Sequence, residues 1–86
     1  MESMVFNETY DMVNDIMDPQ EFRKILQMFK SELAEMLLKL TNHTATKKEI
    51  HKLKSSANSL GAYKVANACD ITTVTECLDD LNKKLE

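Results

Sequence analysis

The sequence predicts an all-α fold, a bundle of helices around one core. Two observations support this prediction. The chain has one Gly and one Pro among its 86 residues, whereas a β-sheet needs many turn residues. Its hydrophobic residues make up 43% of the chain and recur at helical spacing. Because a chain of this length can bury only one core, we expect residues 1–86 to form a single domain.

Two helices are predicted in the first half of the chain. The first runs from about Ser3 to Met17, where apolar residues share one helical face. Asp18 and Pro19 then end it, and Asp18 with Glu21 is predicted to form a capping box for the second helix. The second helix carries the strongest apolar stripe in the sequence, and we expect this stripe to be the centre of the core. The stripe consists of Phe22, Ile25, Leu26, Phe29, Leu33, Met36, Leu37 and Leu40.

A third helix is predicted after the polar connection at residues 41–45. Thr46 and Glu49 are expected to form a capping box at its start. Gly61 stands where a left-handed cap residue would end it. The residues that share its predicted buried face are Ile50, Leu53, Ala57 and Leu60.

The chain after Gly61 contains two apolar faces that differ in direction by roughly 150°, counted at ~100° per residue. One straight helix cannot bury both faces against one neighbour. We therefore predict a break near Asp70 to Thr73, with Thr73 and Glu76 as a capping box for a final helix. One long bent helix over residues 62–86 is the alternative interpretation.

Composition and charge exclude several classes of function. The net charge is −3, whereas a nucleic-acid binder needs a basic surface. The sequence contains neither an apolar run of about 18 residues nor a signal-peptide pattern, so we expect no membrane contact and a cytoplasmic location. The two cysteines, Cys69 and Cys77, have no second pair that would suggest a zinc site, and we expect them to be reduced.

The charges are distributed unevenly along the chain. Residues 1–21 contain six acidic side chains and no Lys or Arg, whereas residues 47–54 contain four lysines and one glutamate. A basic face on an acidic protein predicts an acidic or phosphorylated partner. A solvated helix side that binds nothing is the alternative interpretation.

His51 is the candidate functional residue. On a helical wheel it lies about 140° from the centre of the apolar arc, at ~100° per residue, and therefore faces water. An exposed neutral imidazole is nucleophilic, and Lys54 or Lys47 would partly neutralise a phosphoryl group attached to it. The alternative is a surface histidine without a function. Since His43 and His51 lack zinc-ligand spacing, we expect no metal site. The side chains around His51 on the wheel are Lys47, Lys54, Ser55 and Asn58.

The segment HKLKSSANSLGA, residues 51–62, resembles the signature of the histidine-containing phosphotransfer (HPt) family. The family pattern is approximately His, any residue, Leu, Lys, Gly or a small residue, Ser, Ala, three residues, Gly and Ala. The resemblance extends into the second predicted helix and into residues 62–69, and it is greatest to small, free-standing carriers of bacterial quorum-sensing relays. The matching residues are His51, Leu53, Lys54, Ser56, Ala57, Gly61 and Ala62.

This resemblance implies an antiparallel four-helix bundle with an N-terminal cap helix, and His51 as a phosphoryl carrier between receiver-domain aspartates. Lys54 would steady the phosphoryl charge, and Gly61 would close the helix. Such a protein has no catalytic activity of its own and no cofactor, because the Mg²⁺ belongs to the receiver. Its partners would be response-regulator receivers or a hybrid sensor histidine kinase, and we expect a monomer. The docking surface would consist of Lys47, Ser55, Ser56 and Asn58.

The chain departs from the family pattern at two points. Ser55 stands where many members have Gly, and its hydroxyl could bond to the imidazole or the phosphoryl group. Only 24 residues follow Ala62, so the C-terminal helices are expected to be short. The alternative function is a helical interaction module that binds a receiver or kinase through the same face without carrying phosphate.

Overall fold

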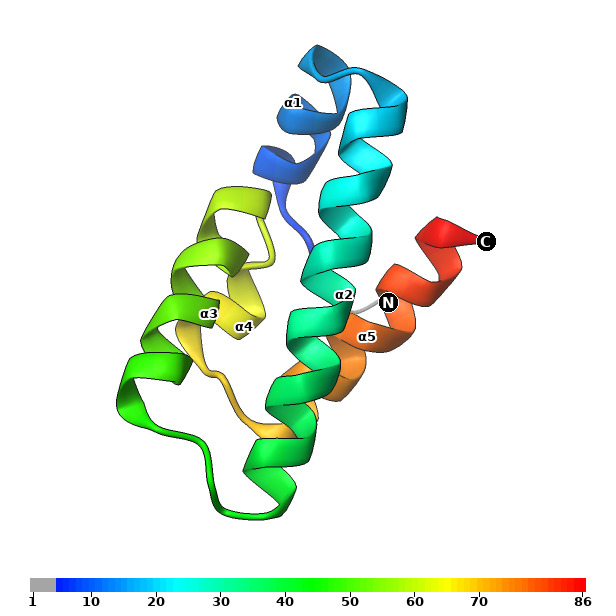
Figure 1. The fold of residues 1–86 in the computed structure, drawn as a ribbon. Helices are drawn as coiled ribbons and strands as arrows, with labels where there is room; N and C mark the ends of the chain where they lie inside the picture. The colour runs from blue at the N-terminus through cyan, green and yellow to red at the C-terminus, as the bar shows by residue number, and fades with distance from the viewer. Residues whose placement is uncertain (1–4) are drawn as a thin grey trace.

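The computed structural model describes residues 5–86, and this part of the chain is all-helical, without a strand. Figure 1 shows α2 running the length of the molecule, with α1 and α3 on one side and α5 crossing it on the other. No helix in the described range combines the length and the apolar character needed to cross a membrane. The helices are α1 (Glu8–Ile16), α2 (Pro19–Thr41), α3 (Lys47–Leu60), α4 (Tyr63–Asn67) and α5 (Ile71–Leu85).

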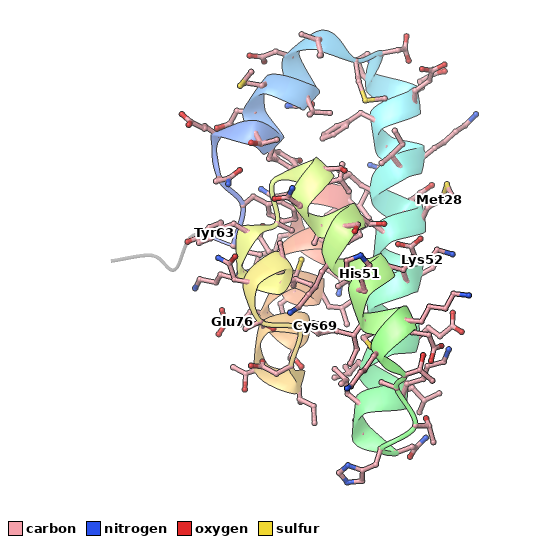
Figure 2. The ribbon with its side chains drawn as sticks, turned by 90° about the vertical axis from the view of Figure 1, so that its left-hand side faces the viewer. Met28, His51, Lys52, Tyr63, Cys69 and Glu76 are labelled. Atoms are coloured by element: carbon pink, nitrogen blue, oxygen red, sulfur yellow. The ribbon has the colours of Figure 1, made fainter. Side chains whose placement is uncertain are left out.

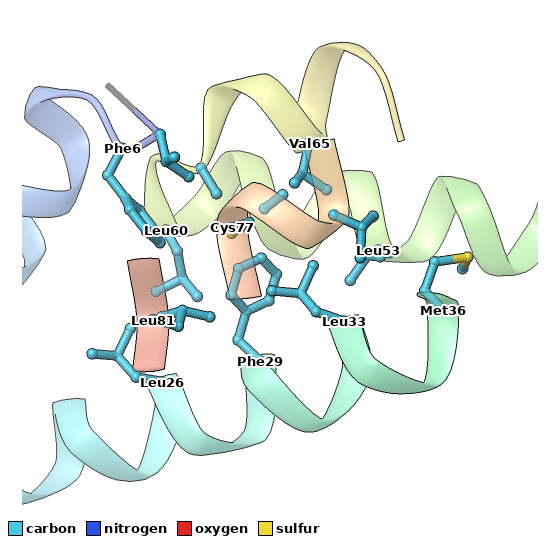
Figure 3. Packing of buried hydrophobic residues seen from close by; sticks show 14 of the residues in the cluster. Phe6, Leu26, Phe29, Leu33, Met36, Leu53, Leu60, Val65, Cys77 and Leu81 are labelled. Atoms are coloured by element: carbon cyan, nitrogen blue, oxygen red, sulfur yellow. The ribbon is translucent and has the colours of Figure 1, made fainter. Parts of the chain in front are cut away.

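The apolar stripe of α2 is the centre of the core, as predicted. Phe29 and Leu33 are almost completely buried, and Figure 3 shows them facing side chains from α3, α4 and α5. Leu81 of α5 closes the core from the opposite side and is fully buried. Burying a side chain of this size contributes about 1.5–3 kcal/mol, so the stripe fixes how the other helices pack. The buried residues of α2 are Phe22, Leu26, Phe29, Leu33 and Met36.

The start of α2 agrees with the sequence only in part. Asp18 is the N-cap, and its carboxylate accepts hydrogen bonds from the backbone N–H groups of Gln20 and Glu21. Pro19 occupies the first turn, where its fixed φ suits a helix. The predicted capping box is incomplete, because the side chain of Glu21 does not return a hydrogen bond to the Asp18 backbone.

Both ends of α3 are confirmed. Thr46 and Glu49 form a reciprocal capping box at its start. Gly61 ends it in the left-handed region, with φ of 79°, and its N–H donates to the last-turn carbonyls. The predicted inward face is also correct, since Leu53, Ala57 and Leu60 are buried. Ile50, the fourth predicted member, is half-buried.

The first helix begins later than predicted. Asn7 is its N-cap and accepts from the Thr9 N–H at 3.0 Å, so α1 starts at Glu8. Val5 and Phe6 precede the helix and are buried in the core, and the Asn7 N–H bonds to the Gly61 carbonyl instead of to a helical turn. The predicted starting residue, Ser3, lies outside the described residues.

The C-terminal region contains a break, as predicted, but the cap is different. Residues 68–70 are not helical, so one long bent helix is the wrong interpretation. Asp70 and Thr73 form the capping box of α5, whereas the predicted box was Thr73 with Glu76. Glu76 instead pairs with Lys64 across the break, at 3.5 Å. The fourth helix, α4, has 5 residues, as expected for a short chain end.

Gly61 is also where α1 meets α3. Its carbonyl accepts a hydrogen bond from the Asn7 N–H at 2.9 Å. A Cβ atom at position 61 would lie 2.6 Å from both Asn7 Oδ1 and the Tyr10 backbone nitrogen. Because real Cβ atoms do not approach this closely and a side chain disfavours positive φ, only glycine fits here.

Gly61→Ala should therefore destabilise the fold, by about 2 kcal/mol from the strained φ and the displacement of α1. For a domain of this size we expect a decrease in Tm of roughly 10 °C, measured by circular dichroism. Asn58→Ala, in the exposed part of the same last turn, is the control and should change Tm little. A Gly61→Ala protein as stable as the wild type would contradict the close approach of α1.

Candidate functional site

His51 lies on the second turn of α3 and is exposed, as the helical wheel predicted. Figure 2 shows its imidazole on the face of α3 that points away from the core, with Lys52 on one side and Cys69 on the other. The buried side chains of α3 hold this orientation, because Leu53 and Ala57 anchor the opposite side of the helix. The imidazole makes no hydrogen bond with any residue in 5–86, so the ring is open to a reactant.

Lys54 is half-buried, and its charge acts on Cys69 in the break between α4 and α5. Burial raises the pKa of the Cys69 thiol, and the neighbouring Lys54 ammonium partly opposes this increase. The ammonium of Lys54 is therefore near enough to Cys69 to affect its thiol electrostatically. Lys47 and Asn58, which follow the same side of α3 as His51, are both exposed.

The two predicted serines have different positions. Ser55 is exposed one turn after His51, but no hydrogen bond joins its hydroxyl to the imidazole. Ser56 is half-buried and faces α2 instead. It lines a groove of about 400 Å³ between α1, α2 and α3, together with Ser59 and the apolar side chain of Met28. Ser56 is thus displaced around the helix from His51, by about 140° at ~100° per residue.

The lysines of α3 are unpaired. Within residues 5–86, no carboxylate lies within ion-pair distance of Lys47, Lys48, Lys52 or Lys54, the four lysines that surround His51 on this helix. Only Lys47 and Lys54 were predicted from the sequence to have roles. Lys52 was not selected, although its position next to His51 could have indicated it. An unpaired cation attracts anions more strongly than one that is already neutralised.

Glu49 is the one acidic residue of α3, and it is fully engaged. Its Oε1 accepts from the Thr46 backbone N–H at 3.1 Å and from the Thr46 hydroxyl at 2.9 Å. Its Oε2 accepts from Lys39 Nζ, which comes from the last turn of α2 and also pairs with Glu35 at 3.4 Å. The hydrogen bond from Lys39, followed by those from Thr46, lowers the pKa of Glu49 to about 2.

Glu49 was predicted from the sequence to be part of a helix cap, but its ion-pair partner Lys39 was not predicted. The two residues are close because α2 and α3 are antiparallel and joined by a short loop. Lys39 is in the last turn of α2, and Glu49 is in the first turn of α3. If the two helices had been assumed to pack antiparallel, their positions would have predicted the contact.

No group of three His, Cys, Asp or Glu side chains in residues 5–86 could hold an ion. His43 lies in the loop between α2 and α3, in a left-handed conformation with φ of 57°, and precedes the helix that carries His51. Cys77 is buried, which raises its pKa to about 12.

The arrangement provides one accessible nucleophile surrounded by unpaired cations. It lacks the neighbouring base that would activate a hydroxyl or thiol nucleophile. A neutral imidazole needs no such base, because one ring nitrogen carries a free lone pair. The site can therefore attack an electrophile that arrives with negative charge.

Comparison with known proteins finds no matching family model, no similar curated protein and no similar solved structure.

The Glu49 interactions predict a specific acid dependence of stability. A glutamate in an unfolded chain titrates near pH 4.3, whereas the pKa of Glu49 in the fold is about 2. Because the folded state favours the ionised form, this contribution is present above about pH 4.3 and is lost as the pH falls towards 2. Urea unfolding between pH 7 and pH 2 should therefore show the wild type losing its advantage over Glu49→Gln on acidification.

Glu49→Gln is a matched variant, because Gln at this position can still complete the capping box with Thr46. All other carboxylates are common to both proteins and cancel in the difference. A difference in unfolding free energy that stays constant from pH 7 to pH 2 would show that Glu49 is not held ionised.

Proposed function

We propose that this protein is a histidine phosphotransfer protein that carries a phosphoryl group on His51 between receiver-domain aspartates of a two-component phosphorelay. The observation that carries the proposal is an exposed imidazole on a rigid, capped helix, surrounded by unpaired lysines. The resemblance of residues 51–62 to the HPt signature supports the same reaction. The protein has no catalytic activity of its own in this proposal.

In the proposed reaction, a ring nitrogen of His51 attacks the phosphorus of an aspartyl phosphate on the receiver. The bond between phosphorus and the aspartate oxygen breaks as the bond to nitrogen forms, and the carboxylate leaves. The reverse step, with another receiver, returns the phosphoryl group to an aspartate. Such transfers depend mainly on positioning and charge neutralisation, so the carrier needs no base. The Mg²⁺ required belongs to the acidic pocket of the receiver.

The residues around His51 have different roles in this proposal. Lys54 stabilises the phosphoryl charge, because it follows His51 by three residues and is therefore its neighbour one turn along α3. Lys47, Ser55 and Asn58 belong to the surface on which the receiver or hybrid kinase docks, whereas Ser56, which was predicted to belong to it, faces α2. The exposed part of this surface is cationic and complements the acidic pocket of a receiver.

The fold is compatible with the proposal. We propose that the chain is a shortened antiparallel four-helix bundle of the HPt type. In this assignment α2, α3 and α5 are three of the four helices, α4 is a remnant of the fourth, and α1 is the cap helix. The protein would act as a cytoplasmic monomer.

His51→Gln should abolish phosphorylation. The wild-type protein, incubated with a phosphorylated receiver domain or an autophosphorylating hybrid kinase, should acquire an acid-labile label, and the variant should acquire none. Glutamine preserves a polar exposed side chain but lacks the nucleophilic nitrogen. His43→Gln, which removes the loop histidine, is the matched control and should be labelled normally. Labelling that survives His51→Gln would overturn the assignment.

Lys54→Gln should slow phosphoryl transfer about tenfold, the equivalent of ~1.4 kcal/mol in the barrier, because it removes a cation one turn from His51 and keeps most of the stem. The time course of label transfer from the receiver measures this rate. Lys24→Gln, on an exposed position of α2, removes the same charge elsewhere and should have no effect. Tm should change little in either variant, and a large decrease for Lys54→Gln would indicate a structural role instead.

An interaction module without phosphate transfer is the competing function. It would bind a receiver or kinase equally well with His51 and with Gln at this position, and neither protein would be labelled. Binding measured beside the labelling assay therefore separates the two functions.

A further inference from the structure

The charge pattern of α3 depends on a residue of another helix. Glu49 is the one acid on α3, and it is two residues from His51. Both of its oxygens are occupied, one by Thr46 and the other by Lys39 of α2. Lys39 therefore neutralises the one negative charge that this helix would otherwise present together with its lysines.

Without Lys39, the carboxylate of Glu49 would have another partner within reach. Lys52 follows Glu49 by three residues, and a Glu followed by a Lys at this spacing forms a favourable intrahelical pair. The two side chains already line one groove of about 180 Å³ between α2 and α3, together with Lys39. Glu32 and Glu35 of α2 are the other acidic residues of this groove.

We propose that Lys39 determines the specificity of the His51 face for anions, by holding Glu49 on the α2 side and so leaving Lys52 unpaired beside His51. The inference rests on the proposed function, because it concerns the approach of the phosphoryl donor to His51. Lys39 is a positioning residue, since it acts through Glu49 and does not touch the imidazole in this structure.

The expected effect is modest and depends on salt. In water, a unit charge about 10 Å from an anion changes its local concentration about twofold. This effect is largest at low ionic strength and is screened when the Debye length shrinks to about 3 Å at 1 M salt. A contribution that vanishes in salt distinguishes charge from a mechanical effect.

The main alternative is that the Lys39–Glu49 pair only holds α2 against α3. Three variants separate this alternative from the proposal: Lys39→Met, Glu49→Gln and the double variant. Lys39→Met lowers the net charge by one, Glu49→Gln raises it by one, and the double variant restores it. All three remove the ion pair, so a purely mechanical role predicts the same defect in each of them.

The probe is phosphoramidate, a small anionic phosphoryl donor that needs no partner protein. A ring nitrogen of His51 attacks the phosphorus, the phosphorus–nitrogen bond of phosphoramidate breaks, and ammonia leaves with the proton that the imidazole gives up. Nuclear magnetic resonance follows the formation of phosphohistidine. The amide shifts of α3 report association of the anion whether or not the bond forms.

At low salt, we expect association and phosphorylation to decrease about twofold in Lys39→Met and to return to the wild-type value in the double variant. Glu49→Gln should equal or exceed the wild type. The differences should disappear at 1 M salt. Lys24→Met, which removes a lysine about 15 residues earlier in α2 and therefore roughly 22 Å away, is the charge control and should behave as the wild type.

Equal defects in all three variants, or a Lys39→Met protein indistinguishable from the wild type at low salt, would overturn the inference. The proposed function fails in a different way. In that case a phosphorylated receiver would not label wild-type His51, whereas the order of the variants towards phosphoramidate would be unchanged.

Discussion

Burial of the apolar stripe of α2 is the constraint on which the rest of this structure depends. Phe29 and Leu33 lie in the middle of the core, and α3, α4 and α5 all contribute side chains against them. Once Leu53 and Ala57 of α3 are placed in this core, the rotation of α3 is fixed. The exposure of His51 follows from that rotation, because it lies on the opposite side of the same helix. The accessible imidazole is thus a consequence of packing elsewhere.

The length of α3 is controlled at both ends by specific chemistry. The reciprocal bonds of Thr46 and Glu49 satisfy backbone groups that have no partner within the helix. At the other end, Gly61 ends the helix and also receives the Asn7 N–H. Because α3 is capped at both ends, fraying is suppressed and the side chains of its second turn stay in place. Positioning of this kind is what a phosphoryl carrier would need, because the reaction requires alignment more than assistance by a base.

The surface of α3 is basic although the protein as a whole is acidic. The chain is acidic overall, with a net charge of −3, and yet α3 presents four unpaired lysines. The difference arises because residues 47–54 contain four lysines and one glutamate, and Lys39 of α2 neutralises that glutamate. An anion that approaches His51 therefore meets cations whose charges are not compensated nearby. Net charge alone would have predicted the wrong sign for this surface.

How far the fold could be predicted depended on the range of the interactions. The all-helical class, the core stripe of α2 and both ends of α3 follow from periodicity and caps within a few residues of one another. Predictions failed at the starts of two helices, where interactions with residues distant in the sequence take part. Asp70 took the N-cap of α5, while Glu76, which was expected to complete the cap, pairs with Lys64. Likewise, Phe6 lies before the first helix, because Asn7 is the N-cap of α1 and its N–H donates to the distant Gly61 carbonyl.

The sequence by itself determined that the chain is helical, where α3 begins and ends, and that His51 faces water, because each of these depends on neighbours within one or two turns. The tertiary structure alone decided the environment of that histidine. It placed Lys54 near Cys69, turned Ser56 towards α2, and joined Lys39 to Glu49. These interactions join α3 to other parts of the chain, and their formation depends on how the helices pack, which helical periodicity does not specify.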